Sequence, residues 1–251
     1  MRKAEQTVNS GLKEPQRLVA LSDGLFATVL TLLVLDLRIP DALVDQGGNI
    51  ETFIKWIGPH LFSYLLTFFV AAVYWLAHHR DFDHVTGYDR TLLSYNLLFL
   101  LFVGLFPFST AAIGLVGFDQ TIYPFYWALY CANIILAGVL LTLTWLYAFT
   151  HGLVDADVTR LQSQHTVARH LLTPAVFLVS VVAEYLFPRA FLGPYALLLI
   201  PLVQTIVDRR YERAGPGFNE ARRGWNEFFW RAGTILIWLL IIGLAVWASA
   251  L

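Results

Sequence analysis

Charged and hydroxyl-bearing side chains stand at the start of the first long apolar segment of the chain. Arg17, Ser22 and Asp23 lie there, and the sequence GLFATVLTLLVLD follows them up to Asp36. Ionisable groups are costly inside a bilayer segment, so by default they mark a functional or architectural site. Here they could hold the segment against neighbouring helices, or take part in moving a cation or a proton.

Helical spacing divides this segment into two faces. At about 100° per residue, one stripe combines hydroxyls with bulky aliphatic side chains: Leu21, Gly24, Leu25, Thr28, Thr31, Leu32 and Leu35. Asp36 continues this stripe. Asp23 points away from it, together with Ala27, Leu30 and Val34. This second face is expected to meet neighbouring helices, where the Asp23 carboxylate must find donors. The threonines either belong to a functional surface or bond back to their own helix, as intramembrane hydroxyls often do. The spacing leaves both interpretations open.

A second polar group lies where the next apolar segment ends, in the sequence YWLAHHR. Antiparallel packing would bring His78, His79 and Asn96 to the end of the bundle that holds Asp23. One interpretation is a capping cluster that fixes helix ends, and another is a histidine beside a carboxylate that senses pH near neutrality. Because the histidines lack a recognised metal-ligand spacing, we predict no metal site and no cofactor.

The composition indicates an integral membrane protein. The chain of 251 residues is 57% hydrophobic and 14% charged, whereas soluble domains are about a quarter charged. A net charge of −1 gives no basic surface for nucleic acid. Cys131 is the only cysteine, which excludes an intramolecular disulfide and a cysteine-rich metal site. The sequence also lacks phosphate-binding loops and nucleophile motifs, so we predict that it is not an enzyme.

Apolar segments of about 20 residues, the length needed to cross a bilayer, predict an all-α fold. The candidate spans are Leu18–Ile39, Ile54–Ala77, Thr91–Val116, Ile122–Phe149, Val167–Phe187, Phe191–Val207 and Ala232–Leu251. Pro107 should kink the third span. Basic residues alternate between the connections so that the N-terminus is expected in the cytoplasm. We predict a six-helix domain over 1–207, a basic cytoplasmic linker over 208–226 and a hydrophobic helix over 227–251, which crosses the membrane or packs outside the bundle.

Three stretches together resemble the transmembrane protein 175 family of potassium channels, in its bacterial branch. They are Arg17-x-x-x-Leu21-Ser22-Asp23, which is similar to that family's Arg-x-x-x-Phe-Ser-Asp signature, then YWLAHHR at 74–80 and NLLFLLFVGLFPF at 96–108. The resemblance covers about residues 15–207. Leu21 departs from the signature, and Thr28 stands where a bulky aliphatic residue is expected.

This resemblance implies a homotetramer without a re-entrant pore loop, in which four copies of the first helix line the pore. It would place Thr28, Leu32 and Leu35 on the pore, with Thr31 close by. Arg17, Ser22 and Asp23 would form a structural network whose expected partners are His78 or His79 and Asn96.

Three functions follow as hypotheses. The leading one is a potassium-permeable cation channel of the bacterial inner membrane, with Asp36 at the pore mouth concentrating cations. The alternative is a proton-coupled secondary transporter in which Asp23 and a histidine form the relay. The third is a membrane protein that binds a partner through its last hydrophobic helix. The expected partners of the chain are K⁺, the lipid bilayer and three further copies of itself.

Overall fold

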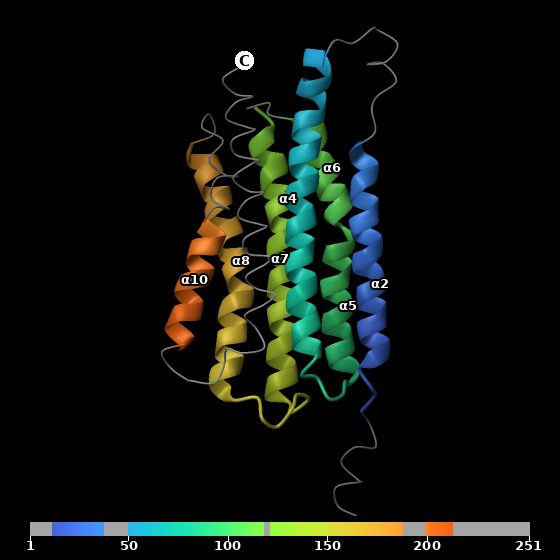
Figure 1. The fold of residues 1–251 in the computed structure, drawn as a ribbon, viewed down its shortest axis with the longest axis vertical. Helices are drawn as coiled ribbons and strands as arrows, with labels where there is room; N and C mark the ends of the chain where they lie inside the picture. Colours follow the sequence, from blue (N-terminus) through green and yellow to red (C-terminus); the bar gives the residue numbers. More distant parts are fainter. Residues whose placement is uncertain (1–11, 38–49, 118–120, 188–198, 213–251) are drawn as a thin grey trace, which may run out of the picture.

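The computed structural model describes residues 12–37, 50–117, 121–187 and 199–212. Within these ranges the regular secondary structure is helical, apart from isolated β-bridges (Figure 1). The helices are α2 (Gln16–Leu33), the 3₁₀ turn η1 (Val34–Leu37), α4 (Ile50–Phe82), α5 (Arg90–Gly104), α6 (Phe106–Val116), α7 (Tyr123–Thr150), α8 (Arg160–Leu186) and α10 (Leu199–Glu212).

Five stretches of the described residues are long and apolar enough to cross a membrane. They correspond to the first five predicted spans, so the chain is a multi-pass membrane protein. The sixth predicted span overlaps α10, which continues to Glu212 and so extends past residue 207 into the predicted linker. The predicted helix over 227–251 lies outside the described residues.

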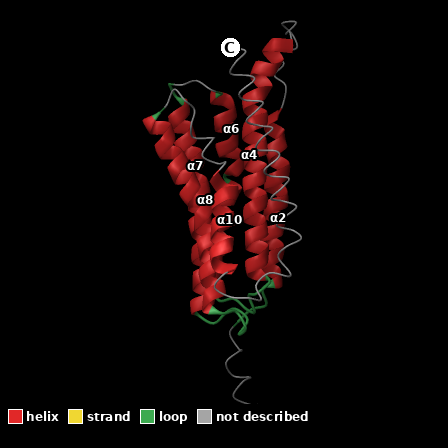
Figure 2. Ribbon diagram, turned by 60° about the vertical axis from the view of Figure 1, so that its left-hand side comes forward, coloured by secondary structure: helices red, strands yellow, loops and turns green. Residues whose placement is uncertain are grey.

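The helices run side by side along one long axis, and α2 lies at the edge of the bundle (Figures 1 and 2). α7 packs against α8 and α5, while α4 packs against α6 and α2. Large aromatic side chains fill the centre, among them Phe26, Tyr74, Phe99, Trp127 and Tyr130. Because van der Waals packing is a main source of helix association in lipid, this aromatic core is the rigid body against which α2 rests.

The third predicted span is interrupted where Pro107 predicted a kink. α5 ends at Gly104 and α6 begins at Phe106, with Pro107 in its first turn. Proline has no N–H to donate, which breaks the helical hydrogen-bond pattern at this point. Thr110 closes the first turn of α6 by donating its hydroxyl to the Phe106 carbonyl at 2.7 Å.

One end of the bundle, which we call the basal end, is closed by short connections. It holds the start of α2 and the α4–α5 and α7–α8 loops, at the bottom of Figure 1. Lys13 pairs with Tyr88, and Val85 pairs with Val154, in two isolated β-bridges. These bridges tie the segment before α2 to one loop and that loop to the next, so the basal end is a connected structure.

Candidate functional site

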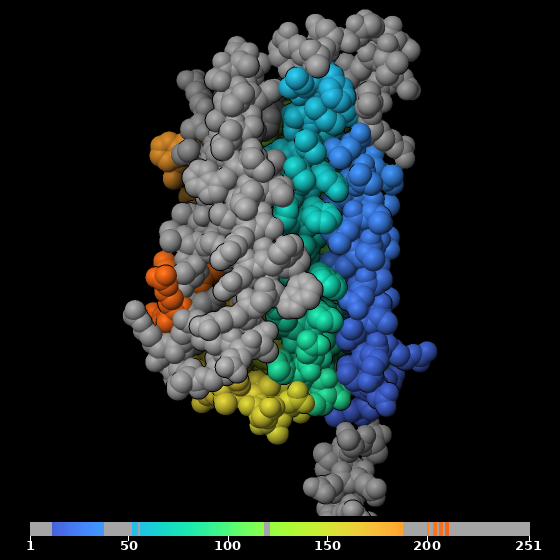
Figure 3. Space-filling model, viewed as in Figure 1, coloured from blue at the N-terminus to red at the C-terminus, as the bar shows by residue number. Residues whose placement is uncertain are grey.

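The helix α2 has one anchored face and one open face. Its buried residues are Leu18, Ser22, Phe26, Val29 and Leu33. The opposite side is exposed, and it includes most members of the predicted stripe. Leu25 is half-buried, whereas the others are exposed: Leu21, Gly24, Thr28, Thr31, Leu32 and Leu35. Figure 3 shows α2 at the rim of the molecule, in blue. Leu21 is 50% exposed and Leu35 48%, so the described residues leave this side of α2 open.

Both threonines of the open face bond back to their own helix. The Thr28 hydroxyl donates to the Gly24 carbonyl at 2.8 Å, and the Thr31 hydroxyl donates to the Thr28 carbonyl at 2.8 Å. The interpretation that the threonines bond back to their own helix is therefore confirmed. It does not remove the threonines from the open face, because each hydroxyl oxygen keeps lone pairs that can accept from water or contact a cation.

The anchored face is held by a directed chain of hydrogen bonds across three helices. His78 Nε2 on α4 lies 2.8 Å from Asn96 Oδ1 on α5, and Asn96 Nδ2 donates to Ser22 Oγ on α2 at 3.2 Å. Ser22 in turn donates to the Leu18 carbonyl at 3.0 Å. Since Asn96 Oδ1 can only accept, His78 donates from Nε2. The structure thus brings together three of the predicted network residues, all of them buried.

Asp23 has a partner that the sequence interpretation did not name. Trp75 on α4 donates its indole N–H to Asp23 Oδ1 at 2.9 Å. His79 is exposed, with its ring stacked on Trp75 at a centroid distance of 5.5 Å. Arg17 is exposed at the start of α2. An indole one turn before the histidines would have been a reasonable candidate, because a buried tryptophan N–H usually finds an acceptor.

Asp36, the predicted pore-mouth acid, lies in η1 and is half-buried. A Cβ added at Gly114 on α6 would lie 3.1 Å from Asp36 Oδ2 and 3.0 Å from Cδ2 of His60 on α4. Oδ2 is buried and has no hydrogen-bond partner among the described residues. This carboxylate oxygen therefore faces the α4–α6 contact, at the end of the bundle opposite the basal end.

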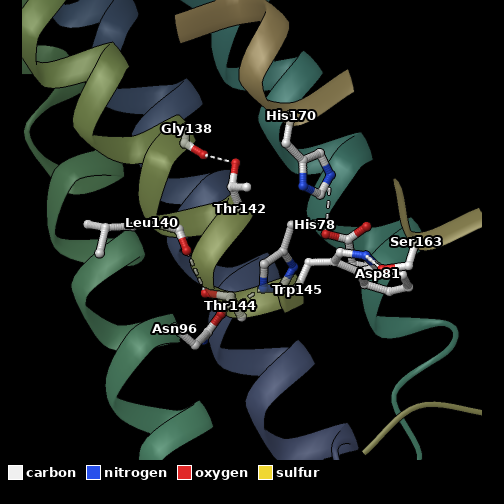
Figure 4. Close-up of polar contacts among 10 residues, drawn as sticks. All are labelled: His78, Asp81, Asn96, Gly138, Leu140, Thr142, Thr144, Trp145, Ser163 and His170. Atoms are coloured by element: carbon white, nitrogen blue, oxygen red, sulfur yellow. Dashed lines mark hydrogen bonds and ion pairs between the residues drawn. The ribbon is translucent and has the colours of Figure 1, made fainter. Parts of the chain in front are cut away.

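A buried contact between a histidine and an aspartate lies deeper at the basal end, and sequence reasoning missed it. His170 Nε2 on α8 lies 3.3 Å from Asp81 Oδ2 on α4, with both side chains less than a tenth exposed (Figure 4). Asp81 follows His78 by one helical turn on α4. Asp81 and His170 are far apart in sequence, so their contact could have been predicted only from knowing how α4 and α8 are aligned against each other.

The described residues contain no cluster of three or more His, Cys, Asp or Glu side chains able to hold a metal ion. The polar groups around α2 are instead arranged as hydrogen-bonded anchors on one side and an open, mainly apolar face on the other. This arrangement can fix a helix and present a surface, and it offers no nucleophile or general-base pairing near that surface.

Comparison with known proteins gives a partial match to one family and likenesses to several channels. Residues 17–107 match the family described as endosomal/lysosomal potassium channel TMEM175. The chain is 36% identical over 102 residues to a potassium channel of Streptomyces collinus, a region that covers 41% of this chain and 48% of that protein. It is 25% identical over 202 residues to a potassium channel of a Chryseobacterium species, covering 79% and 96% respectively.

A solved structure is also similar in fold. It is a homologue, from Chamaesiphon minutus, of the lysosomal potassium-selective channel TMEM175, and it superposes with a TM-score of 0.63 at 22% identity, covering 78% of this chain and 97% of that one. The aligned region spans about half the length of the Streptomyces relative. The matched proteins are ion channels, which confirms the prediction that the chain is not an enzyme.

Proposed function

We propose that the protein is a potassium-permeable cation channel, since its residues 17–107 match the TMEM175 family. Four copies would place the open face of α2 around a common axis. The observation that carries the proposal is the division of α2 into a face anchored by Ser22 and Phe26 and a face left open within the subunit. An uncovered helix face is suited to line a cation path, and Asp36 follows it in η1 with Oδ2 toward α4 and α6.

The chemistry of the open face supports conduction without a carbonyl filter. The Thr28 hydroxyl proton is used by the Gly24 carbonyl, so the oxygen presents its lone pairs outward, as a cation requires. Leu32 and Leu35 lie beyond it on the same face and are about half exposed. Rings of such apolar side chains gate by excluding water, so a threonine ring followed by leucine rings forms a constriction that is wetter at one end.

Asp36 belongs to the same proposal as the acid at the mouth. Four carboxylates near one axis would raise the local cation concentration through their focused negative potential. The N-terminus would face the cytoplasm of a bacterial inner membrane, following the excess of basic residues at the basal end. Asp23 is held by Trp75, so the proposal uses it as an anchor of α2 and does not need it as a proton carrier.

Ion flux in proteoliposomes tests the proposal. The full chain is reconstituted with an outward potassium gradient, and flux is compared with an equal sodium gradient and with no imposed pH difference. We expect potassium flux that needs no proton gradient, and a several-fold lower basal flux in Thr28→Ile because an isoleucine ring excludes water more strongly.

Thr150→Ile is the matched control. Thr150 is an exposed threonine on α7 that also bonds back to its helix, to the Leu146 carbonyl at 2.7 Å, but it does not belong to the open face of α2. Its substitution should leave flux unchanged. Equal flux in the wild type and Thr28→Ile would remove Thr28 from the pore, and absence of potassium flux from correctly assembled protein would refute the channel.

A further inference from the structure

The carboxyl group of Asp36 is turned away from the open face of α2. Asp36 continues the stripe of Leu32 and Leu35 in the sequence, but it lies in η1, which packs against α4 and α6. Its Oδ2 atom is buried and has no hydrogen-bond partner among the described residues. The negative charge therefore faces the α4–α6 contact, where the packing must leave room for it.

Gly114 on α6 leaves this room. A Cβ added at Gly114 would lie 3.1 Å from Asp36 Oδ2 and 3.0 Å from Cδ2 of His60 on α4, both closer than an ordinary van der Waals contact. The carboxylate oxygen and the edge of the imidazole ring thus face the same point, which stays empty because residue 114 has no side chain. We call this point, bounded by Gly114 and His60, the seat of Asp36.

The α4 wall of the seat is fixed. The His60 side chain belongs to a residue that is only 7% exposed, and its ring stacks on Trp56 at a centroid distance of 4.6 Å. Nδ1 of His60 lies 2.9 Å from the Trp56 carbonyl, and because a carbonyl can only accept, Nδ1 donates there. These two contacts hold the ring, so it does not turn aside to admit a larger residue 114.

The α6 wall is fixed as well, although a break separates this short helix from α5. Oγ1 of Thr110 lies 2.7 Å from Oγ1 of Thr67 on α4, which in turn lies 3.1 Å from the Tyr130 hydroxyl on α7. All three side chains are fully buried, and Thr110 precedes Gly114 by one helical turn. Since both walls are held, a side chain added at Gly114 would displace Asp36, which is half-buried and lacks a hydrogen bond at Oδ2 among the described residues.

We propose that Gly114 and His60 are positioning residues for Asp36: their seat holds its carboxylate away from the open face of α2 and so limits how strongly it attracts cations to the mouth. This inference rests on the proposed channel function, in which Asp36 is the acid at the mouth. A carboxylate released from the seat would lie nearer to a passing cation, and the potentials of four such charges add. Residue 114 thus adjusts conductance without touching the ion.

Two substitutions separate the seat from the charge. Gly114→Ala fills the seat with one methyl group and leaves the charge of Asp36 in place. Asp36→Asn keeps the shape of the side chain and removes its charge. If Gly114 acts only through Asp36, the two substitutions are not additive, and Gly114→Ala has no effect on conductance in a chain that already carries Asp36→Asn.

Gly58→Ala is the matched control. Gly58 lies on α4, two residues before His60, and a Cβ added there meets nothing within 4 Å. Like Gly114→Ala, this substitution replaces a helical glycine by alanine, so it reproduces the general effect of that exchange on helix stability. It should keep the wild-type conductance at every salt concentration.

The experiment is a single-channel recording of the full-length protein in symmetric KCl at about 0.1 M and about 1 M, between which the Debye length falls from about 10 Å to about 3 Å. Gly114→Ala should raise the conductance at the lower concentration by about twofold or more. At the higher concentration it should change the conductance by less than about 1.2-fold, because salt screens the charge. The double variant Gly114→Ala/Asp36→Asn should match Asp36→Asn at both concentrations.

Asp36→Glu replaces Gly114→Ala if the latter does not elute as the native assembly. It keeps the charge but is one methylene too long for the seat, so it should raise the conductance at low salt in the same way. An unchanged or reduced low-salt conductance in the variant used, or an equal rise when Gly114→Ala is combined with Asp36→Asn, overturns the inference and leaves the channel standing. Absence of potassium current from the correctly assembled wild type overturns both.

Discussion

Ser22 and Ser94 make the same local hydrogen bond but have different neighbours. Each donates its hydroxyl to the carbonyl four residues earlier, Ser22 to Leu18 at 3.0 Å and Ser94 to Arg90 at 2.9 Å. Only Ser22 is buried and also accepts a hydrogen bond, from Asn96. Comparing the two serines therefore isolates how much the hydrogen bond from Asn96 to Ser22 contributes to the stability of the packed α2.

We expect Ser22→Ala to lower the free energy of unfolding by about 1 to 3 kcal/mol, because it leaves the buried Asn96 amide without its acceptor. Ser94→Ala, at an exposed position, should change it by less than about 0.5 kcal/mol. Denaturant unfolding in detergent, followed by circular dichroism, measures both. Equal effects of the two substitutions would show that the Asn96 contact contributes nothing to stability.

The sequence predicted which side chains of α2 share a face better than it predicted their partners. Helical spacing grouped Thr28, Leu32 and Leu35, and all three lie on the open face. The same spacing put Ala27 and Val34 with Asp23 toward neighbouring helices, but both are exposed. A helical wheel gives angles about one axis and carries no information on where other helices lie, and for that reason the Asp81–His170 contact could not be predicted.

Gly138 marks the closest approach among three helices. It lies on α7, where an added Cβ would clash with the Pro174 ring of α8 and lie 2.6 Å from the Tyr74 hydroxyl of α4. That hydroxyl is fixed, because it donates to the Ile134 carbonyl at 2.8 Å. Neither neighbour can move without disturbing a packed helix, so the absence of a side chain at Gly138 is required by the α4–α7–α8 contact.

Gly138→Ala should therefore destabilise the protein by about 1 to 3 kcal/mol, the usual cost of overpacking a well-packed core. Gly104→Ala provides the comparison, since a Cβ there meets nothing within 4 Å. In a helix alanine is favoured over glycine, so this second substitution should be neutral or slightly stabilising. The thermal unfolding midpoint of each purified variant gives the answer, and a stable Gly138→Ala chain would contradict the close packing.

Asp89 caps α5 at the basal end, and its contribution to folding stability depends on pH. Its carboxylate accepts from the Leu92 amide at 2.8 Å and from the Tyr147 hydroxyl at 2.6 Å. Burial favours the neutral acid, but these hydrogen bonds outweigh it and lower the pKa of Asp89 below its ordinary value. A carboxyl group with a lowered pKa in the folded state contributes stability above the pKa of the unfolded chain, about 4, and loses it as pH falls through the folded value.

Asp89→Asn keeps an acceptor for the Leu92 amide and removes the ionisation. The wild type should lose on the order of 1 kcal/mol more stability than Asp89→Asn between about pH 5 and about pH 3. Asp157→Asn, at an exposed position in the α7–α8 loop, serves as the control and should follow the wild type. Parallel pH profiles for wild type and Asp89→Asn would argue against a stabilising role of the charge.

Helix identity was predictable, but helix ends were not. The sequence placed the first five spans and the Pro107 break, because apolar runs of membrane length and a missing N–H leave clear signals. The second span was expected to end at Ala77, whereas α4 continues through His78 and Asp81 to Phe82. Hydropathy marks where apolar side chains stop, while a helix continues for as long as its backbone hydrogen bonds are favourable. Asp81, which contacts His170, lies in this hidden extension.

The division of α2 into two faces has a consequence for the complete assembly. A helix held at the rim by Ser22, Asp23 and Phe26, with Leu21, Leu32 and Leu35 about half exposed, can meet lipid or other copies of itself. The subunit alone does not distinguish these environments, since both are apolar. Only contact between copies would bring four α2 helices to one axis, and this contact can be trapped covalently.

Leu35→Cys should form disulfide-linked dimers on mild oxidation in the membrane, because cysteines around a narrow axis come within the approximately 7 Å between Cα atoms that a disulfide tolerates. One new cysteine per subunit forms one bond, so dimers are the largest expected covalent product even from a tetramer. Cys131 is buried, and the wild type should stay monomeric on denaturing gels. Leu171 on α8 is similarly exposed, at 43% against 48% for Leu35, and α8 lies apart from α2 in the bundle (Figure 1). Leu171→Cys should therefore not cross-link. Dimers from Leu171→Cys but not from Leu35→Cys would place α8 between subunits and α2 in lipid, and the pore would have to be sought elsewhere.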